Sequence, residues 1–439
     1  MIENEQMRMP WRRTFLLGFG FFGMSLLWPL YDSFVPIFLR GFGLSNRMVG
    51  FGMTVDNYVN MFIQPWVGQR SDRTHTRFGR RFPYILVGAP LAALGVVLIP
   101  LGARQSLVLL LGAMFLFTIS MALFRSPTVA LLGDMFPPVL RSQANGIINF
   151  MGVLAAVLAF VLGGLLFEIN TILPFALFAV AMLVMLVLLM FLVREPVEPY
   201  DAGEPSSGMI DTLQALRTNP DRSALLILLA LLAWSVGLTA LQAFWTLFGV
   251  NELGLAEGAA AQLLSFYPLA GLLFAIPGGY LGTYLGRRRT ILICLVAVAA
   301  LLATFLFIPA TLLQGAANFN LLEPATWFAT PGMQIVILLL LGAGAMMTVV
   351  TVNILPLLFD NAPEGQIGAY TGLYYLFGSI ASILGPPLGG LLVDLTGSYR
   401  TIFVFAPLWV ALGLLLLWMV REPTAQRPIS KVQSLDGTA

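Results

Sequence analysis

Four ionisable side chains lie within or at the edge of long apolar segments of this chain, and they are the residues best suited to chemistry. They belong to Asp32, Asp56, Arg125 and Asp134. A charged group at the centre of a membrane helix costs roughly 2.5–3.5 kcal/mol on insertion scales, so each of them needs a reason to be there. A carboxylate in a low dielectric can take up and release a proton, and a guanidinium can bind a polar ligand. These residues are therefore the first candidates for a functional site.

The composition indicates a membrane protein. Of 439 residues, 58% are apolar and 10% are charged, whereas soluble proteins average about 45–50% and about 25%. The net charge of +2 argues against nucleic acid as a partner. The single cysteine, Cys294, and the single histidine, His75, exclude internal disulfides and argue against zinc sites and a Ser-His-Asp triad. We therefore expect no metal, no cofactor and no enzymatic activity.

Stretches of about 20 apolar residues predict an all-α membrane protein with twelve transmembrane helices. The predicted helices cover residues 14–39, 48–68, 83–103, 106–133, 143–168, 171–193, 223–248, 258–285, 288–313, 333–359, 365–393 and 399–420. The first run is about twice as long as the core of a signal peptide, so we expect it to be retained.

The arginines predict the orientation of the chain in the membrane. The amino end, the even-numbered loops and the carboxyl tail carry 18 Lys or Arg residues, whereas the odd-numbered loops carry four. By the positive-inside rule, both termini are predicted to be cytoplasmic. We expect a multi-pass protein of the cell (inner or plasma) membrane.

The chain contains two related halves. Residues 194–222 are rich in proline and acidic residues and predict a cytoplasmic linker between an N-terminal six-helix half, 1–193, and a C-terminal six-helix half, 223–439. Landmarks of the first half recur 226 residues later: Asp134, Gly146 and 162–166 at Asp360, Gly372 and 388–392. The loop after the second helix recurs at an offset of 211, from Gly68 to Gly279. We interpret the chain as two copies of one six-helix unit, the architecture of major facilitator transporters.

One segment carries a specific resemblance. Residues 64–83 read QPWVGQRSDRTHTRFGRRFP, which resembles the pattern QPxxGxxSDRxxSRFGRRRP of the sucrose-transporter-like branch of the glycoside/pentoside/hexuronide cation symporters, within the major facilitator superfamily. Residues 130–134 and 141–145 resemble the segment of that branch between the fourth and fifth helices. The second half resembles a generic facilitator, and Thr283 stands where the repeated loop motif carries an aspartate. The resemblance implies sugar transport with proton coupling, and it places Asp134 at a proposed proton-coupling position.

Asp32 and Asp56 are predicted to lie at similar depth on consecutive helices, roughly 10–12 Å inside the outer surface at 1.5 Å per residue. Two carboxylates at one depth disfavour each other's charge, which suits a proton carrier. Asn57, Asn60 and Gln64 continue a polar stripe from Asp56, so a functional interpretation is favoured there.

For Asp32, a functional role is no more favoured than a structural one. The carboxylate can instead cap a water-filled vestibule or accept a hydrogen bond from a neighbouring backbone group. Trp28 and Tyr31 lie one turn and one residue before it, and such aromatic side chains suit stacking and hydrogen bonding to a sugar ring.

Arg125 and Asp134 lie nine residues apart on the fourth predicted helix, so they face opposite ways and cannot pair with each other. We expect Arg125 to meet another helix, a water-filled cavity or the substrate. For Asp134 a second interpretation competes with proton coupling: it can latch the Arg-rich loop when the inner gate closes, with Arg73 or Arg80 as its partner, and the spacing favours this latch. The predicted gate residues are Asp72, Arg73, Arg77, Arg80 and Arg81.

The second half offers neutral and aromatic groups. The predicted substrate-binding residues there are Gln242, Trp245, Asn353 and Tyr374. Gln242 and Asn353 fall in the middle of apolar runs, although either can instead bridge two helices. Charges in one half and neutral groups in the other suit an uncharged, polyhydroxylated solute.

These observations lead to a functional hypothesis: a monomeric proton-coupled symporter of a sugar or glycoside, most simply a disaccharide such as sucrose or maltose, working by alternating access. Its partners are the sugar, the proton and the lipid bilayer. The alternative with the same fold is a proton-driven exporter of a small amphiphilic compound. A membrane-embedded enzyme or a transport-dead sensor is disfavoured, because no histidine or cysteine constellation and no signalling domain is present.

Overall fold

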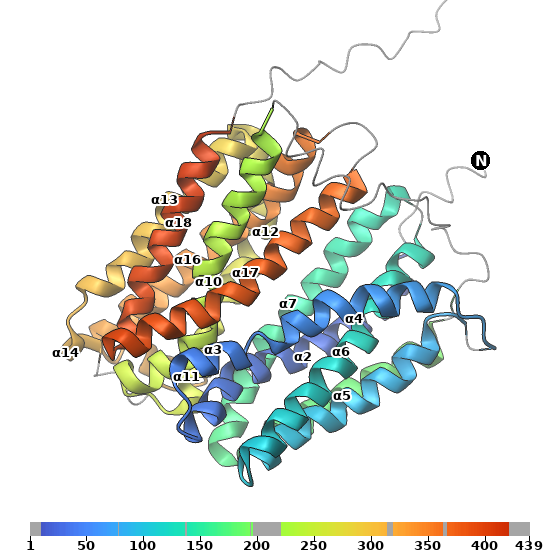
Figure 1. The fold of residues 1–439 in the computed structure, drawn as a ribbon, viewed down its shortest axis with the longest axis horizontal. Helices are drawn as coiled ribbons and strands as arrows, with labels where there is room; N and C mark the ends of the chain where they lie inside the picture. Colours follow the sequence, from blue (N-terminus) through green and yellow to red (C-terminus); the bar gives the residue numbers. More distant parts are fainter. Residues whose placement is uncertain are drawn as a thin grey trace, which may run out of the picture.

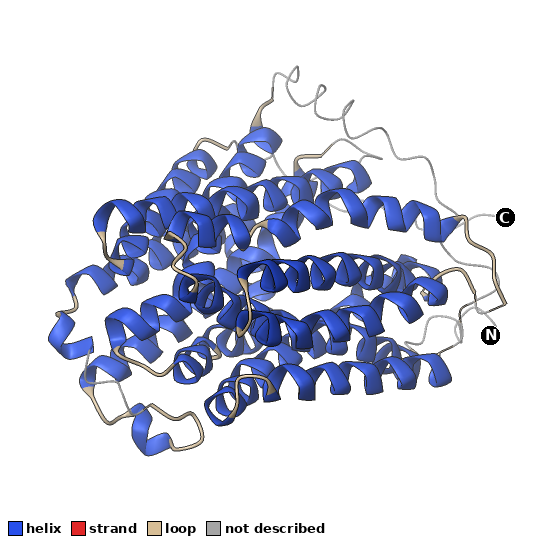
Figure 2. Ribbon diagram, turned by 60° about the horizontal axis from the view of Figure 1, so that its bottom comes forward, coloured by secondary structure: helices blue, strands red, loops and turns tan. Residues whose placement is uncertain are grey.

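The computed structural model describes residues 10–77, 79–136, 138–193, 195, 221–313, 319–362 and 367–420. These residues form helices and connecting turns without any strand (Figure 2), so the predicted all-α class is confirmed. Nearly all of the predicted linker, 194–222, lies outside the described residues.

Seven helices make up the first half of the described chain. They are α2 (Trp11–Gly41), α3 (Asn46–Gly52), α4 (Val55–Asp72), α5 (Phe82–Ala103), α6 (Leu107–Met135), α7 (Pro138–Ile169) and α8 (Leu173–Leu192). The second half contains α10 (Ser223–Leu253), α11 (Glu257–Leu264), α12 (Phe266–Leu285), α13 (Arg287–Phe307), α16 (Pro331–Asp360), α17 (Ile367–Thr396) and α18 (Ile402–Trp418). Short turns of helix complete it: α14 (Ala310–Leu313), α15 (Pro324–Trp327) and η2 (Tyr399–Thr401).

Eleven segments of the described residues are long and apolar enough to cross a bilayer. The predicted run 48–68 is not among them, because it is polar and is divided into α3 and α4 at Met53 and Thr54. Together with this divided helix, the segments make the twelve predicted crossings. The crossing that begins at Glu257 is divided in the same way at Ser265, which is 211 residues after Thr54, the offset of the internal repeat.

The helices form two bundles, α2–α8 and α10–α18, which meet at one end and diverge toward the other (Figure 1). The diverging end carries the Arg-rich loops that follow α4 and α12, and we call it the Arg-rich end. At the opposite end, which we call the far end, α3 packs on α17 and α11 packs on α7. The two bundles are therefore in contact at the far end and spread apart toward the Arg-rich end.

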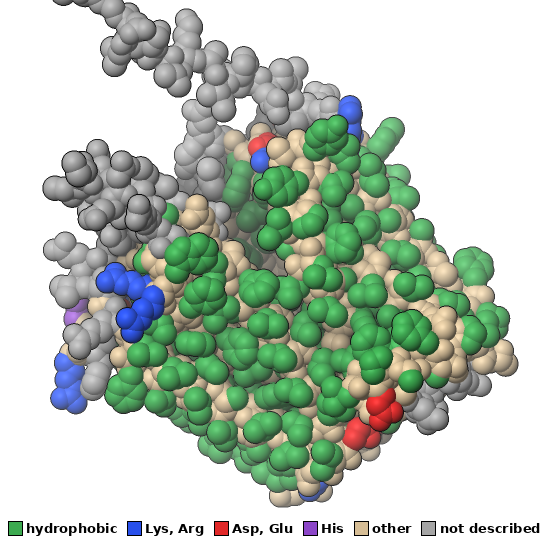
Figure 3. Space-filling model, turned by 180° about the vertical axis from the view of Figure 1, so that it is seen from behind, with side chains coloured by type: hydrophobic (Ala, Val, Ile, Leu, Met, Phe, Trp, Pro, Cys, Tyr) green, Lys and Arg blue, Asp and Glu red, His purple; other side chains and the backbone are tan. Residues whose placement is uncertain are grey.

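Apolar side chains cover the middle of the face seen in Figure 3, and charged side chains lie at its margins. This is the surface expected of a protein surrounded by lipid. Within the first bundle, α5 lies close against α6 because Gly88 and Gly95 have no side chain: a Cβ on either would come within 2.8 Å of the α6 backbone. This tight pair supports the helix that carries Arg125.

Candidate functional site

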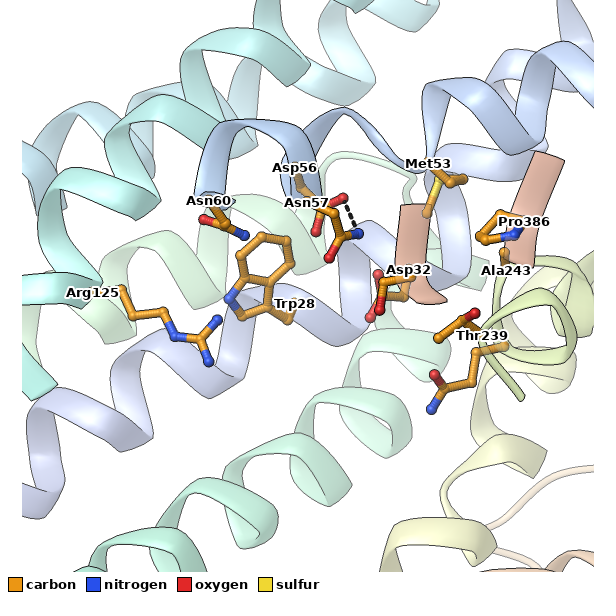
Figure 4. Close-up of a pocket in the computed structure, with 12 residues that line it drawn as sticks. Trp28, Asp32, Met53, Asp56, Asn57, Asn60, Arg125, Thr239, Ala243 and Pro386 are labelled. Atoms are coloured by element: carbon orange, nitrogen blue, oxygen red, sulfur yellow. Dashed lines mark hydrogen bonds between the residues drawn. The ribbon is translucent and has the colours of Figure 1, made fainter. Parts of the chain in front are cut away.

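A cavity of about 240 Å³ lies between the two bundles (Figure 4). Side chains from both halves line it: Trp28, Asp32, Met53, Asp56, Asn57, Asn60, Arg125, Thr239, Gln242, Ala243, Ser382 and Pro386. The structure thus brings together seven residues that the sequence nominated separately as coupling or binding residues: Trp28, Asp32, Asp56, Asn57, Asn60, Arg125 and Gln242.

Two helices position the carboxylates. Trp28 and Asp32 lie four residues apart on α2 and therefore share a face. The break between α3 and α4, where the Thr54 hydroxyl donates to the Phe51 carbonyl at 2.8 Å, lets the first turns of α4 present Asp56 and its neighbours to the cavity. Figure 4 shows Asp56 beside Asn57, and Asp32 among the other side chains that line the cavity.

The charged groups of the cavity are sparsely paired. Asn57 Nδ2 donates to Asp56 Oδ1 at 2.9 Å. Asp32 and Arg125 make no hydrogen bond or ion pair with the rest of the described chain, and both side chains are exposed to the cavity. The Asp56 carboxylate is close enough to interact electrostatically with the side chains of both Asp32 and Arg125. Three charged side chains therefore remain available to a proton or a ligand.

Trp28 is held as a wall of the cavity by aromatic neighbours. Its ring meets Tyr31 and Phe117 edge-on, with centroids 5.8 and 5.5 Å apart, and Tyr31 stacks on Phe117. Tyr31 is completely buried behind Trp28, so the structure places it in the support of the site rather than in its lining. A rigid indole held in this way can stack on the apolar face of a ring.

The second half contributes neutral groups. Thr239, Gln242 and Ala243 come from α10, and Ser382 and Pro386 come from α17. Gln242 is exposed to the cavity, whereas the Thr239 hydroxyl donates to the Ser235 carbonyl at 2.8 Å and can still accept a hydrogen bond. Sequence reasoning missed Thr239 and Ser382, because hydroxyls of this kind are common in membrane helices and carry no spacing signal.

Besides Tyr31, four predicted binding residues lie outside the lining of this cavity. Gln64 donates to Asn60 Oδ1 at 2.9 Å, one turn along α4 toward the Arg-rich end. Trp245 is buried, and its Nε1 donates to the Ala260 carbonyl at 3.0 Å. Tyr374 is half-buried against the core and meets Tyr375 edge-on.

Asn353 is the fourth. Its buried Nδ2 donates to the carbonyls of Gly278 and Val349 at 2.8 Å each, so it joins α16 to α12. Asn353 therefore bridges two helices, which is one of the two roles that the sequence left open.

Asp134 lies in a separate charge cluster at the Arg-rich end. Its carboxylate pairs with Arg80 and accepts from Arg81 Nε at 2.9 Å. Arg81 also contacts Asp72 Oδ1 and Ser71 Oγ at 2.5 Å each. Burial alone lowers the pKa of the Arg81 guanidinium, but the hydrogen bond and charge of Asp134, followed by those of Asp72, raise that pKa above its ordinary value. Arg81 is therefore a permanent cation bound to two carboxylates.

This cluster lies within one half of the molecule. It joins the loop after α4 to the end of α6, and a matching pair, Arg287 and Asp360 at 2.6 Å, joins α13 to α16 in the other half. Arg73 and Arg77, the remaining predicted gate residues, are exposed in the same loop. Arg80 is thus the predicted partner that contacts Asp134 in this conformation.

Known proteins resemble this chain over different lengths. "Multidrug resistance protein 2" of Bacillus subtilis (strain 168) is 22% identical over 415 residues, covering 92% of this chain and 94% of that protein. The sucrose transport protein SUC3 of Arabidopsis thaliana is 25% identical over 162 residues, which are 32% of this chain and 27% of that protein.

Solved structures share the fold at low identity. A bacterial homologue of the human lysosomal transporter Spinster, in an inward-facing and unoccupied conformation, superposes with a TM-score of 0.70 at 14% identity, covering 94% of this chain and 98% of that one. The nucleoside transporter NupG superposes with a TM-score of 0.67 at 13% identity, covering 93% and 99%.

The model of one family matches residues 14–355 and 251–436, which together span nearly the whole sequence. That family is described as the Major Facilitator Superfamily. Its fold is that of membrane transporters, in agreement with the two bundles and the cavity between them. The chain therefore belongs to the major facilitator superfamily.

Proposed function

We propose that this transporter couples the uptake of an uncharged, polyhydroxylated solute, a sugar or glycoside such as sucrose or maltose, to the movement of a proton. The observation that carries the proposal is the lining of the cavity, where carboxylates and a rigid indole face neutral amide and hydroxyl groups across the two halves. An indole stacks on a sugar ring, and amides donate to and accept from its hydroxyls. The partial similarity to a plant sucrose transport protein supports the same substrate class.

Asp56 and Asp32 are the proposed proton carriers. With both carboxylates and Arg125 ionised, the cavity carries two negative charges and one positive charge, so a single proton makes it neutral. Enclosing a net charge in a low dielectric is costly, and the protonated cavity therefore closes around its ligand more readily. Coupling follows if the sugar is enclosed only when the proton is present.

Asp134 is proposed as a latch rather than a proton carrier, because it is bound by Arg80 and Arg81 away from the cavity. The Arg-rich end is proposed to face the cytoplasm of a cell membrane, since 18 of the 23 basic residues belong to the loops and termini on that side. In that orientation the structure is open inward.

A second candidate is the proton-driven export of a small amphiphilic compound. The similarity to a multidrug resistance protein over 92% of this chain favours it. The polar lining of the cavity favours the sugar, because a site built of amides and carboxylates leaves polar groups unpaired against an apolar ligand. The two candidates therefore differ in the ligand that they predict.

The experiment uses purified protein in liposomes, with sucrose, maltose and other glycosides tested against amphiphilic dyes. We expect an inward proton gradient to drive uphill uptake of one glycoside. Asp56→Asn should abolish uphill uptake and preserve exchange of labelled for unlabelled sugar at equal concentrations, because exchange needs binding but no net proton movement. Glu323→Gln, which removes an exposed carboxylate outside the cavity, is the matched control.

Two results would overturn the proposal. Undiminished uphill uptake by Asp56→Asn and by Asp32→Asn would remove both residues from proton coupling. Proton-driven movement of dyes, with every sugar inert in protein of normal thermal stability, would replace the sugar symporter with the exporter.

A further inference from the structure

Two carboxylates join the bundles at the far end in matching ways. Glu168, at the end of α7, accepts from the backbone N–H of Gly258 in the first turn of α11 at 2.7 Å. Asp394, near the end of α17, accepts from the backbone N–H groups of Asn46 and Arg47 in the first turn of α3 at 2.8 Å each. Each carboxylate thus binds the start of a helix that belongs to the other half.

The internal repeat relates these two contacts. Glu168 and Asp394 are 226 residues apart, and Arg47 and Gly258 are 211 residues apart. These are the two offsets that relate the halves of the sequence. The same interaction therefore occurs twice, with the roles of the halves exchanged.

Glycines bring the helices close enough for both contacts. Gly164 lies one turn before Glu168, and a Cβ on it would overlap the carbonyl oxygen of Gly258. Gly390 lies one turn before Asp394, and a Cβ on it would overlap the carbonyl oxygen of Asn46. These glycines are also 226 residues apart. The close approach and the carboxylate contact are thus repeated together.

These contacts lie at the end where the cavity is closed. A further hydrogen bond between the two bundles lies at the same end, from the Tyr399 hydroxyl to Asn46 Oδ1 at 2.7 Å. At the Arg-rich end, the ion pairs of Asp134 and Asp360 each stay within one half. Separation of the bundles at the far end must therefore break the contacts of Glu168 and Asp394.

We propose that Glu168 and Asp394 are the paired residues of an outer gate: each holds the first turn of a helix of the opposite half, and both must release before the cavity opens at the far end. The assignment rests on the alternating-access fold and is independent of the transported solute. It adds two functional residues to those of the cavity and the Arg-rich loop.

Distance measurements between spin labels test this gate in the full-length protein. Cys294 is the sole cysteine, so Cys294→Ala gives a background without thiols. Labels at Gln105→Cys and Leu322→Cys, exposed in loops at the far end, report separation there. Labels at His75→Cys and Tyr284→Cys report the Arg-rich end.

Asp394→Asn and Glu168→Gln keep the shape of each side chain but lose its charge. An amide also has fewer acceptor sites than a carboxylate. We expect each variant to raise the ratio of far-end-open to far-end-closed molecules by about fivefold or more, since a hydrogen bond to a charged group is worth more than a neutral one. The double variant should show roughly the product, with closure at the Arg-rich end increasing in parallel.

Glu323→Gln is the matched control. Glu323 is an exposed carboxylate at the same end, and it accepts from Asn320 Nδ2 at 3.5 Å within its own half. The control variant should therefore leave both distance distributions unchanged. Wild-type distributions in the double variant would overturn the gate, and so would an equal shift in Glu323→Gln.

Discussion

Arg81 and Asp134 form an ion pair with the Nε and Oδ2 atoms 2.9 Å apart, and their side chains are only 5% and 1% exposed. In the second half, Asp360, the counterpart of Asp134 in the internal repeat, pairs with Arg287, and these side chains are 39% and 42% exposed. The internal repeat has therefore kept the pairing at both sites but buried only one of them. Since burial decides what an ion pair contributes, the two halves should respond differently to its loss.

Asp134→Asn should lower the free energy of unfolding by about 3 kcal/mol, because the buried Arg81 loses its main counter-ion. Asp360→Asn should cost less than about 1 kcal/mol, since both partners are partly solvated. Thermal unfolding of the purified variants in one detergent measures the contrast. Equal losses of stability in the two variants would contradict it.

The contribution of Arg81 should be independent of pH across the neutral and moderately alkaline range. Its pKa in the folded protein is raised above the ordinary value by Asp134 and Asp72, despite burial. The stabilisation is fully present below the pKa of the unfolded state and is lost only as pH rises through the still higher folded value. The difference in melting temperature between the wild type and Arg81→Gln should thus stay constant from about pH 7 to about pH 10. A difference that shrinks by pH 9 would show that Arg81 loses its proton.

Substitutions of Gln242 and Asn353 should affect different properties: the first should lower the affinity for the sugar, and the second should lower the stability of the fold. Gln242→Leu removes an amide that is exposed to the cavity, so we expect sugar affinity to fall by about tenfold with the melting temperature preserved. Asn353→Leu removes a buried hydrogen bond from α16 to the Gly278 carbonyl of α12 and a second one to the Val349 carbonyl within α16, so we expect a loss of about 1–3 kcal/mol of stability. Ligand-dependent shifts in thermal unfolding report both quantities in one experiment. A weaker sugar response in Asn353→Leu alone would reverse the assignment.

The sequence predicted much of this cavity because a polar side chain in an apolar run is costly and therefore informative. Asp56, Asn57 and Asn60 could be grouped by helical spacing alone, and Arg125 had no partner within its own helix. The twelve crossings followed from segment length. The break at Thr54 could not be predicted from segment length. A continuous helix and a divided helix bury nearly the same residues, and they differ only in the direction of the turn that follows.

Residues whose role depends on helix packing were harder to predict. Trp245 and Asn353 have the same types as true cavity residues, and only the contacts of α10 with α11 and of α16 with α12 show that they face other helices. Glu168 and Asp394 lie at helix ends, where a charge costs little free energy and therefore does not indicate a functional residue. Their partners are backbone N–H groups, which every sequence contains, so the contact is visible only in three dimensions.

The glycines beside these carboxylates give the sharpest test of the far-end interface. Gly164→Ala and Gly390→Ala place a Cβ against a carbonyl oxygen of the opposite half, so the bundles cannot close fully at the far end. The ratio of far-end-open to far-end-closed molecules should therefore rise, as measured with the labels at Gln105→Cys and Leu322→Cys.

Gly146→Ala and Gly378→Ala lie on the same two helices, α7 and α17, and their Cβ atoms would meet nothing within 4 Å. They should leave that ratio unchanged and raise helix stability by roughly 0.5–1 kcal/mol, because alanine is the better helix former. If all four variants shifted the ratio alike, the effect would come from helix propensity. A shift confined to Gly164→Ala and Gly390→Ala places it at the points where α7 meets α11 and α17 meets α3.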